Sequence, residues 1–146
     1  MKVFERFTEG ARMAMSLANA EAHCFDQECI GTGHVLLGII GEGTGAGAKV
    51  LASFVGDLSK VQLDVEKKMG GRASDKVVTG KLPQSPQTKK AVEYSIEEAM
   101  NFRHNYIGTE HMLLGLLREK GTAFEVLQNL GLELERVREE VLKLRA

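Results

Sequence analysis

The sequence predicts an all-α fold of eight helices, arranged as two four-helix repeats related by a pseudo-twofold axis. Three observations support this prediction: a nine-residue segment recurs with two differences, apolar residues recur at three- and four-residue steps, and no stretch alternates long enough to indicate a sheet. The repeated segment is IGTGHVLLG at 30–38 and IGTEHMLLG at 107–115. Because the repeat aligns two copies of one unit, a function proposed for one copy can be checked against the other.

The register of the repeat extends over most of the chain. At an offset of 77 residues, four residues before the first motif match four before the second: Ala14, Glu21, Ala22 and Phe25 against Ala91, Glu98, Ala99 and Phe102. Beyond the motif the offset falls to 76, where the pair Val-Leu at 50–51 matches 126–127. We therefore expect a first repeat at 1–69, a linker at 70–84 and a second repeat at 85–146, together forming one compact domain.

Capping residues and glycines divide the first repeat into four helices. Thr8 followed by an acidic residue is a typical helix start, and alanines at three- and four-residue steps follow it. Thr32 is expected to cap the second helix, which the glycine-rich stretch 41–45 ends. The helices after the first are expected at 33–40, 46–54 and 58–68.

The second repeat begins after a stretch rich in Gly, Ser, Asp and Lys, which is typical of a linker. Ser85 and Pro86 suit the N-cap and first position of a helix. The inward faces of the two motif helices carry paired leucines, which we expect at the centre of each repeat: Leu36, Leu37, Leu113 and Leu114. Helices are expected at 86–102, 109–119, 122–130 and 133–145.

Composition and charge limit the classes of function. A hydrophobic content of 43% is ordinary for a globular protein, and a net charge of −1 gives no electrostatic basis for binding nucleic acid. The longest apolar run, 35–40, is too short to span a bilayer, and the first residues do not resemble a signal peptide. Two cysteines cannot form a disulfide scaffold, so a reducing cytoplasm is expected.

The glycine-rich stretch GEGTGAGAK at 41–49 resembles a phosphate-binding loop only superficially. A P-loop needs glycine directly before the lysine and serine or threonine after it, whereas Ala48 precedes Lys49 and Val50 follows. The second copy lacks the glycines. No nucleotide, other cofactor or catalytic group is therefore expected.

One alternative is a small metal-binding protein. Thiolate and imidazole are zinc ligands, and the first repeat holds four such side chains: His23, Cys24, Cys29 and His34. Their spacing is not that of a usual closed zinc site, and the equivalents Met100, Asn101 and Tyr106 are not comparable ligands. The two motif histidines, which recur in both copies, suit a structural role at a helix start.

The Gly-Thr-Glu-His element at 108–111 is a candidate ligand site. Thr109 at a helix start would leave backbone N–H groups facing an anion, and Glu110 could accept two hydrogen bonds from a guanidinium. The alternative is ordinary capping with an acidic residue in the first turn. In the first copy Thr32 is followed by Gly33, which has no carboxylate, so that site is degenerate.

Three segments carry a resemblance to a known family: FERFTEGAR at 4–12, IGTGHVLLGIIGEGTGAGAKVL at 30–51 and HNYIGTEHMLLGLLRE at 104–119. They resemble the Clp N-terminal repeat, which forms the N-domain of ClpC-type AAA+ unfoldases of bacteria and plastids and occurs in ClpA-type relatives. The resemblance implies an eight-helix module that receives protein substrates and adaptor proteins. Such a module passes them to an ATPase ring that feeds the ClpP peptidase.

The resemblance also implies a ligand. In similar ClpC proteins the glutamate of each Gly-Thr-Glu-His element takes part in recognising phosphoarginine. Carried over by motif, this function would fall to Thr109 and Glu110, while Thr32 and Gly33 could bind phosphate only weakly through backbone N–H groups. The expected protein is a non-enzymatic module of the cytoplasm or plastid stroma, acting on an ATPase ring in cis or in trans. It would be either the N-domain of a longer unfoldase or a free-standing adaptor or modulator.

Overall fold

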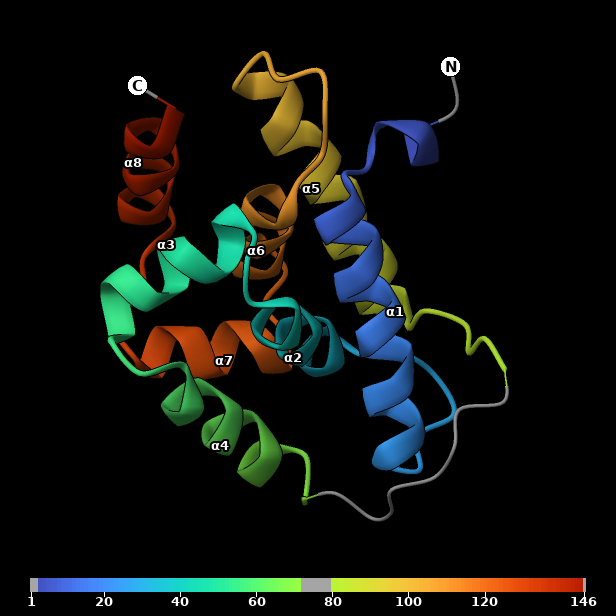
Figure 1. Ribbon diagram of the computed structural model, residues 1–146. Helices are drawn as coiled ribbons and strands as arrows, with labels where there is room; N and C mark the ends of the chain where they lie inside the picture. Colours follow the sequence, from blue (N-terminus) through green and yellow to red (C-terminus); the bar gives the residue numbers. More distant parts are fainter. Residues whose placement is uncertain (1–2, 72–79, 146) are drawn as a thin grey trace.

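The computed structural model describes residues 3–71 and 80–145, which form eight α-helices after a short 3-10 turn, η1 (Val3–Arg6) (Figure 1). The all-α, two-repeat prediction is confirmed. The centre of the expected linker, 72–79, lies outside the described residues. The helices are α1 (Glu9–Cys24), α2 (Thr32–Glu42), α3 (Ala46–Val55), α4 (Leu58–Lys68), α5 (Pro86–Asn101), α6 (Thr109–Arg118), α7 (Thr122–Asn129) and α8 (Leu134–Arg145).

The start of α2 differs from the sequence prediction. Gly31, not Thr32, is the N-cap, and Thr32 is the first residue of the helix. The backbone N–H of Gly31 donates to Nδ1 of His34 at 2.8 Å, so the histidine does what glutamate or glutamine does in a capping box. The side chain of Thr32 is thereby left for another contact, described below.

In each repeat the first two helices form a tightly packed pair, α1 with α2 and α5 with α6. A Cβ on Gly38 would overlap the carbonyl oxygen of Ala14, and one on Gly115 would overlap that of Ala91. Only glycine therefore allows these two helix pairs to approach so closely. By contrast, α1 and α5 do not pack on each other, and a groove separates them.

Backbone hydrogen bonds join the two repeats at the segments that precede their first helices, α1 and α5. Thr8 N–H donates to the carbonyl of Ile107 at 3.0 Å, and Ile107 N–H donates to that of Arg6 at 2.8 Å. The equivalent pair on the other side joins Ile30 to the segment before α5, from Ile30 N–H to the Pro83 carbonyl at 2.8 Å and from Ser85 N–H to the Ile30 carbonyl at 2.9 Å. The segment before the first helix of each repeat is therefore hydrogen-bonded to the motif isoleucine of the other repeat.

The core lies where the motif helices α2 and α6 meet the rest of the fold. The four motif leucines are buried as predicted, and α6 has every residue but its last buried. Among the described residues no single helix is long and apolar enough to cross a membrane, although α2 and α3 together would pass that test with a 97° bend between them.

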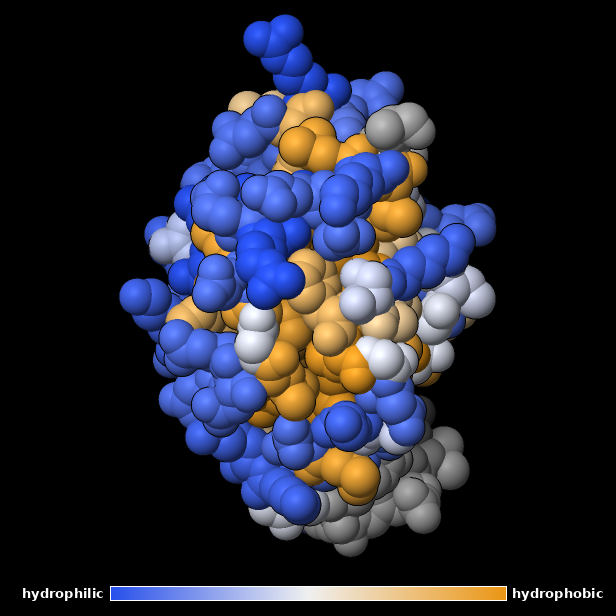
Figure 2. Space-filling view, turned by 90° about the vertical axis from the view of Figure 1, so that its left-hand side faces the viewer, coloured by the Kyte–Doolittle hydropathy of each residue, from blue (hydrophilic) through white to orange (hydrophobic). Residues whose placement is uncertain are grey.

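Helices α3, α4, α7 and α8 lie on the side of the molecule away from α1 (Figure 1). Figure 2 shows this side, where apolar surface runs down the middle between charged borders. Three of the large exposed apolar side chains belong to α4 and α8: Leu63, Leu142 and Leu144. Because they are already in contact with water, these side chains provide surface controls for tests of the core and the groove.

Replacing Leu114 with alanine should lower the free energy of unfolding by about 2–5 kcal/mol, because Leu114 is fully buried and its truncation leaves a cavity. Leu63→Ala on the exposed face of α4 is the control and should cost about 0.5 kcal/mol or less. Urea denaturation followed by circular dichroism measures both. Equal losses in the two variants would contradict the assignment of the core.

Candidate functional site

The Gly-Thr-Glu-His element of the second repeat lies inside the molecule. The side chains of Thr109 and Glu110 belong to residues only 2% and 3% exposed, which differs from the open helix start expected from the sequence. The cause is the start of α3, where a Cβ on Gly45 or Gly47 would approach Thr109 to 2.6 Å. Glycine at both positions lets the N-termini of α3 and α6 meet at Thr109.

Thr109 joins these two helix starts directly. Its Oγ1 accepts a hydrogen bond from the backbone N–H of Gly47 at 2.8 Å, and so satisfies a donor that α3 itself cannot pair. The equivalent contact is made by Thr32, whose Oγ1 accepts from the N–H of Ala123 at 3.3 Å, at the start of α7. The motif threonine of each repeat, Thr32 or Thr109, therefore caps the third helix of the other repeat.

Glu110 is a buried carboxylate close to that junction. Tyr106 donates a hydrogen bond from its hydroxyl to Oε2 of Glu110 at 3.3 Å. Burial raises the pKa of Glu110 above its usual value, because a charged carboxylate is poorly solvated there. A group of this kind pairs strongly with a cation that excludes water from it, and a guanidinium offers two parallel donors.

In the first repeat another side chain takes the space that a glutamate would need. A Cβ on Gly33 would lie 2.6 Å from Sδ of Met69, which follows the end of α4. The residue equivalent to Met69 at an offset of 76 is Arg145. Gly33 in the sequence already indicated that the first site lacks a carboxylate. Because the equivalent of Met69 is an arginine, the repeat gave no sign that Met69 fills the space where a glutamate side chain would lie.

The two motif histidines serve as structural groups. Nδ1 of His111 accepts from the N–H of Gly108 at 3.0 Å, as His34 does at Gly31, so the proton of each neutral ring lies on Nε2. His111 can donate that proton to Nδ1 of His104 at 2.8 Å. Burial lowers the pKa of His34 and of His111 from 6.5 to about 4, and at His111 the nearby His104 adds to the effect.

The four proposed metal ligands of the first repeat do not assemble. Nε2 of His23 lies 2.9 Å from the carbonyl oxygen of Gly80, and Nδ1 of His34 is engaged at Gly31. Cys24 is buried and Cys29 is half-buried, and no disulfide joins them. Among the described residues, no three His, Cys, Asp or Glu side chains are placed to hold a metal ion, so the structure does not support the metal-binding alternative.

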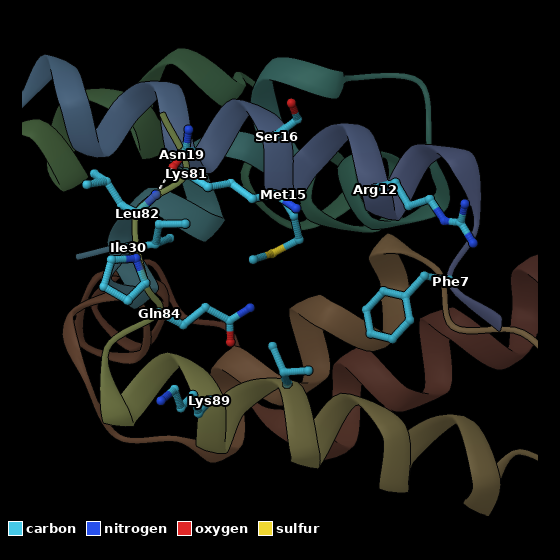
Figure 3. Close-up of a pocket in the computed structure, with 12 residues that line it drawn as sticks. Phe7, Arg12, Met15, Ser16, Asn19, Ile30, Lys81, Leu82, Gln84 and Lys89 are labelled. Carbon is cyan, nitrogen blue, oxygen red and sulfur yellow. Dashed lines mark hydrogen bonds between the residues drawn. The ribbon is translucent and has the colours of Figure 1, made fainter. Parts of the chain in front are cut away.

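A second candidate site, which sequence reasoning missed, is the groove between α1 and α5. It has a volume of about 840 Å³, and Figure 3 shows side chains of both helices around it. The described end of the linker, 80–84, forms one end of the groove. Asn19 Oδ1 accepts a hydrogen bond from the N–H of Leu82 at 2.8 Å, and Asn19 Nδ2 donates to the Gly80 carbonyl at 2.9 Å. The groove is lined by Phe7, Arg12, Met15, Ser16, Asn19, Ile30, Lys81, Leu82, Pro83, Gln84, Lys89 and Val92.

The groove lies between equivalent parts of the two repeats. At the offset of 77, Arg12 on α1 corresponds to Lys89 on α5, and Met15 corresponds to Val92. Met15 and Val92 are only half-buried although they occupy inward positions one turn after Arg12 and Lys89. The equivalence of Met15 and Val92 is the one feature of the sequence that could have pointed to the groove. Apolar residues at matching positions of the first helix of each repeat indicate a surface that the two helices share.

Comparison with known proteins identifies the family. The Clp repeat (R) N-terminal domain family matches the chain at residues 6–129 and again at 83–145. The chain belongs to this family. One relative is the ATP-dependent Clp protease ATP-binding subunit ClpA homologue of Guillardia theta. It is 48% identical over 143 residues, which is 97% of this chain and 17% of that protein. The chloroplastic chaperone protein ClpC1 of Arabidopsis thaliana is 46% identical over the same share of this chain and 15% of its own length.

Solved structures share the fold of this Clp repeat domain. The N-terminal domain of the chaperone ClpD from Arabidopsis thaliana is 26% identical, with a TM-score of 0.75 and coverage of 99% of this chain and 98% of that one. The Hsp104 N-terminal domain from Candida albicans also has a TM-score of 0.75, covering 96% and 91%, at 15% identity. The latter likeness concerns the fold alone.

The cross-repeat caps predict a stability effect. Thr109→Val keeps the shape of the side chain but leaves the buried N–H of Gly47 without its acceptor, which should cost about 1–3 kcal/mol. Thr32→Val is the matched variant and should cost less, because its hydrogen bond is longer. Urea denaturation gives both values. A loss below about 0.5 kcal/mol for Thr109→Val would show that the bond across the repeats contributes little.

The buried histidines predict how stability depends on pH. In the unfolded chain they take up protons below about pH 6.5, whereas in the folded protein they stay neutral until about pH 4. Their contribution to stability is therefore present above pH 6.5 and is lost as the pH falls towards 4, by about 1.4 kcal/mol per pH unit for each histidine.

The double variant His34→Gln/His111→Gln tests this dependence. Glutamine at the third position of a helix can still accept the N–H of the N-cap residue, but it does not titrate. Denaturation midpoints between pH 4.5 and 6.5 should therefore change less steeply in the double variant than in the unaltered protein. Parallel curves for the two proteins would show that other groups cause the acid sensitivity.

Proposed function

We propose that this chain is the substrate- and adaptor-binding module of a ClpC-type ATP-dependent unfoldase that feeds the ClpP protease. The chain spans less than a fifth of the length of the relatives it matches, so the ATPase ring would lie outside it, in cis or in trans. The observation that carries the proposal is the open groove between α1 and α5. On this view the module itself binds and does not catalyse, in the cytoplasm or the plastid stroma.

The groove has the properties that a polypeptide-binding surface needs. Half-buried apolar side chains such as Met15 and Val92 offer contact to the apolar residues of an unfolded chain. Gln84, whose side chain points into the groove in Figure 3, supplies a polar group for a bound backbone. A volume of about 840 Å³ accommodates a few side chains, which suits a segment of chain better than a whole folded surface.

Binding of a permanently unfolded protein, such as reduced and carboxymethylated lactalbumin, tests this proposal by fluorescence polarisation. Met15→Asp places a charge among the apolar side chains of the groove and should weaken binding about tenfold or more. Leu63→Asp is the matched control on exposed α4 and should leave binding unchanged. Equal affinities of all three proteins, or no binding by any, would overturn the proposal.

The same proposal includes phosphoarginine as a ligand of the second repeat, at Thr109 and Glu110. Two features support it. The N-termini of α3 and α6 meet at Thr109, and helix N-termini favour an anion such as a phosphoryl group. The buried carboxylate of Glu110 lies beside them and could hold the guanidinium. The first repeat, with Thr32 and Gly33, would bind weakly or not at all, since Met69 fills the space of the missing carboxylate.

Calorimetric titration with phosphoarginine tests this part. Glu110→Gln should weaken binding at least about tenfold, because it removes the charge that pairs with the guanidinium while keeping the shape. Gly33→Glu should create a site in the first repeat, and Met69→Ala in addition should strengthen it, since Sδ of Met69 must move to admit the new side chain. Two equal sites in the unaltered protein, or binding untouched by Glu110→Gln, would contradict the proposal.

A further inference from the structure

We propose that the groove between α1 and α5 selects extended protein segments in which apolar side chains are flanked by carboxylates. This inference rests on the proposed function and specifies the class of segment that the groove receives. Three observations support it: the charges that line the groove, their places along it, and the apolar side chains between them.

The lining of the groove is basic although the chain as a whole is not. Among the described residues that line it are Arg12, Lys81 and Lys89 and no aspartate or glutamate, whereas the whole chain has 19 basic and 20 acidic residues. Among the described residues neither Lys81 nor Lys89 has an ion-pair partner. A groove of this charge attracts acidic segments and repels basic ones.

The cations lie towards the two ends of the groove. Figure 3 shows Arg12 near Phe7 at one end, and Lys81 and Lys89 towards the other. The repeat accounts for part of this arrangement, because Arg12 and Lys89 are equivalent residues on helices related by the pseudo-twofold. A bound segment that runs along the groove would therefore meet a positive charge near each of its ends.

The middle of the groove is apolar. Met15 extends into the space between α1 and α5 in Figure 3. Its equivalent Val92 belongs to α5 and also lines the groove. Burial of apolar side chains here would provide most of the affinity, because exposed ion pairs are individually weak and screened by salt. The cations would then decide which apolar segments bind.

Labelled peptides separate these two contributions. The probe is a fluorescein-labelled peptide with the core Leu-Phe-Leu flanked on each side by two aspartates, compared by fluorescence polarisation with the same core flanked by lysines. The acid-flanked peptide should bind about tenfold more tightly, and the difference should shrink as salt is added. Replacement of the core by serines should abolish binding of both.

Reversing the charges of groove residues tests whether the groove causes the preference for acid-flanked peptides. Arg12→Glu/Lys89→Glu should remove or invert the preference for acidic flanks. The matched control, Lys60→Glu/Lys67→Glu, reverses two charges on α4, which packs on α2, α3 and α7 but on neither α1 nor α5 among the described helices, and should leave the preference intact.

The outcomes distinguish this inference from the function on which it rests. Equal binding of both peptides, or an equal effect of the control variant, overturns the charge selection while binding of the unfolded protein still supports the groove. If neither peptide nor the unfolded protein binds, both the selection and the proposed function fail.

Discussion

The structure depends on backbone hydrogen bonds exchanged between the two repeats. The residues before α1 pair with Ile107 of the second repeat, and Ile30 of the first repeat pairs with the residues before α5. Thr109 and Thr32 add a cap from each repeat to the third helix of the other. Because these bonds join each repeat to the other repeat or to the linker before α5, neither repeat can satisfy its own buried backbone groups alone.

Both candidate sites follow from this exchange. The pairings hold the starts of α1 and α5 on opposite repeats without letting the two helices touch, which leaves the groove between them. The cap from Thr109 draws the N-terminus of α3 against that of α6, beside Glu110. The chain thus places its apolar surface and its buried carboxylate at the junctions of two similar units, where small departures from symmetry, such as Gly33 and Met69, make the two sides different.

The sequence predicted the features that repeat or that follow helical periodicity, and it failed where contacts cross between repeats. The eight helices and the burial of Leu114 and its equivalents followed from periodicity and the offset of 77. The role of Thr32 was misassigned, because capping preferences are local while its partner, Ala123, lies in the other repeat. Likewise, Glu110 was expected at an open helix start, and nothing local indicated that α3 covers it. The groove was missed because its lining comes from segments far apart in the chain.

The bonds between the repeats make the two repeats one cooperative unit, and native-state hydrogen exchange in the Leu114→Ala variant tests this cooperativity most directly. Leu114 lies in the second repeat, so a local effect would be confined to that repeat. The amide of Ile30 in the first repeat is bonded to Pro83 before α5, and the amide of Ile107 in the second repeat is bonded to Arg6, so together the two amides report on both repeats. We predict that the variant lowers the protection of the two amides by the same factor. A loss at Ile107 with unchanged protection at Ile30 would contradict the account.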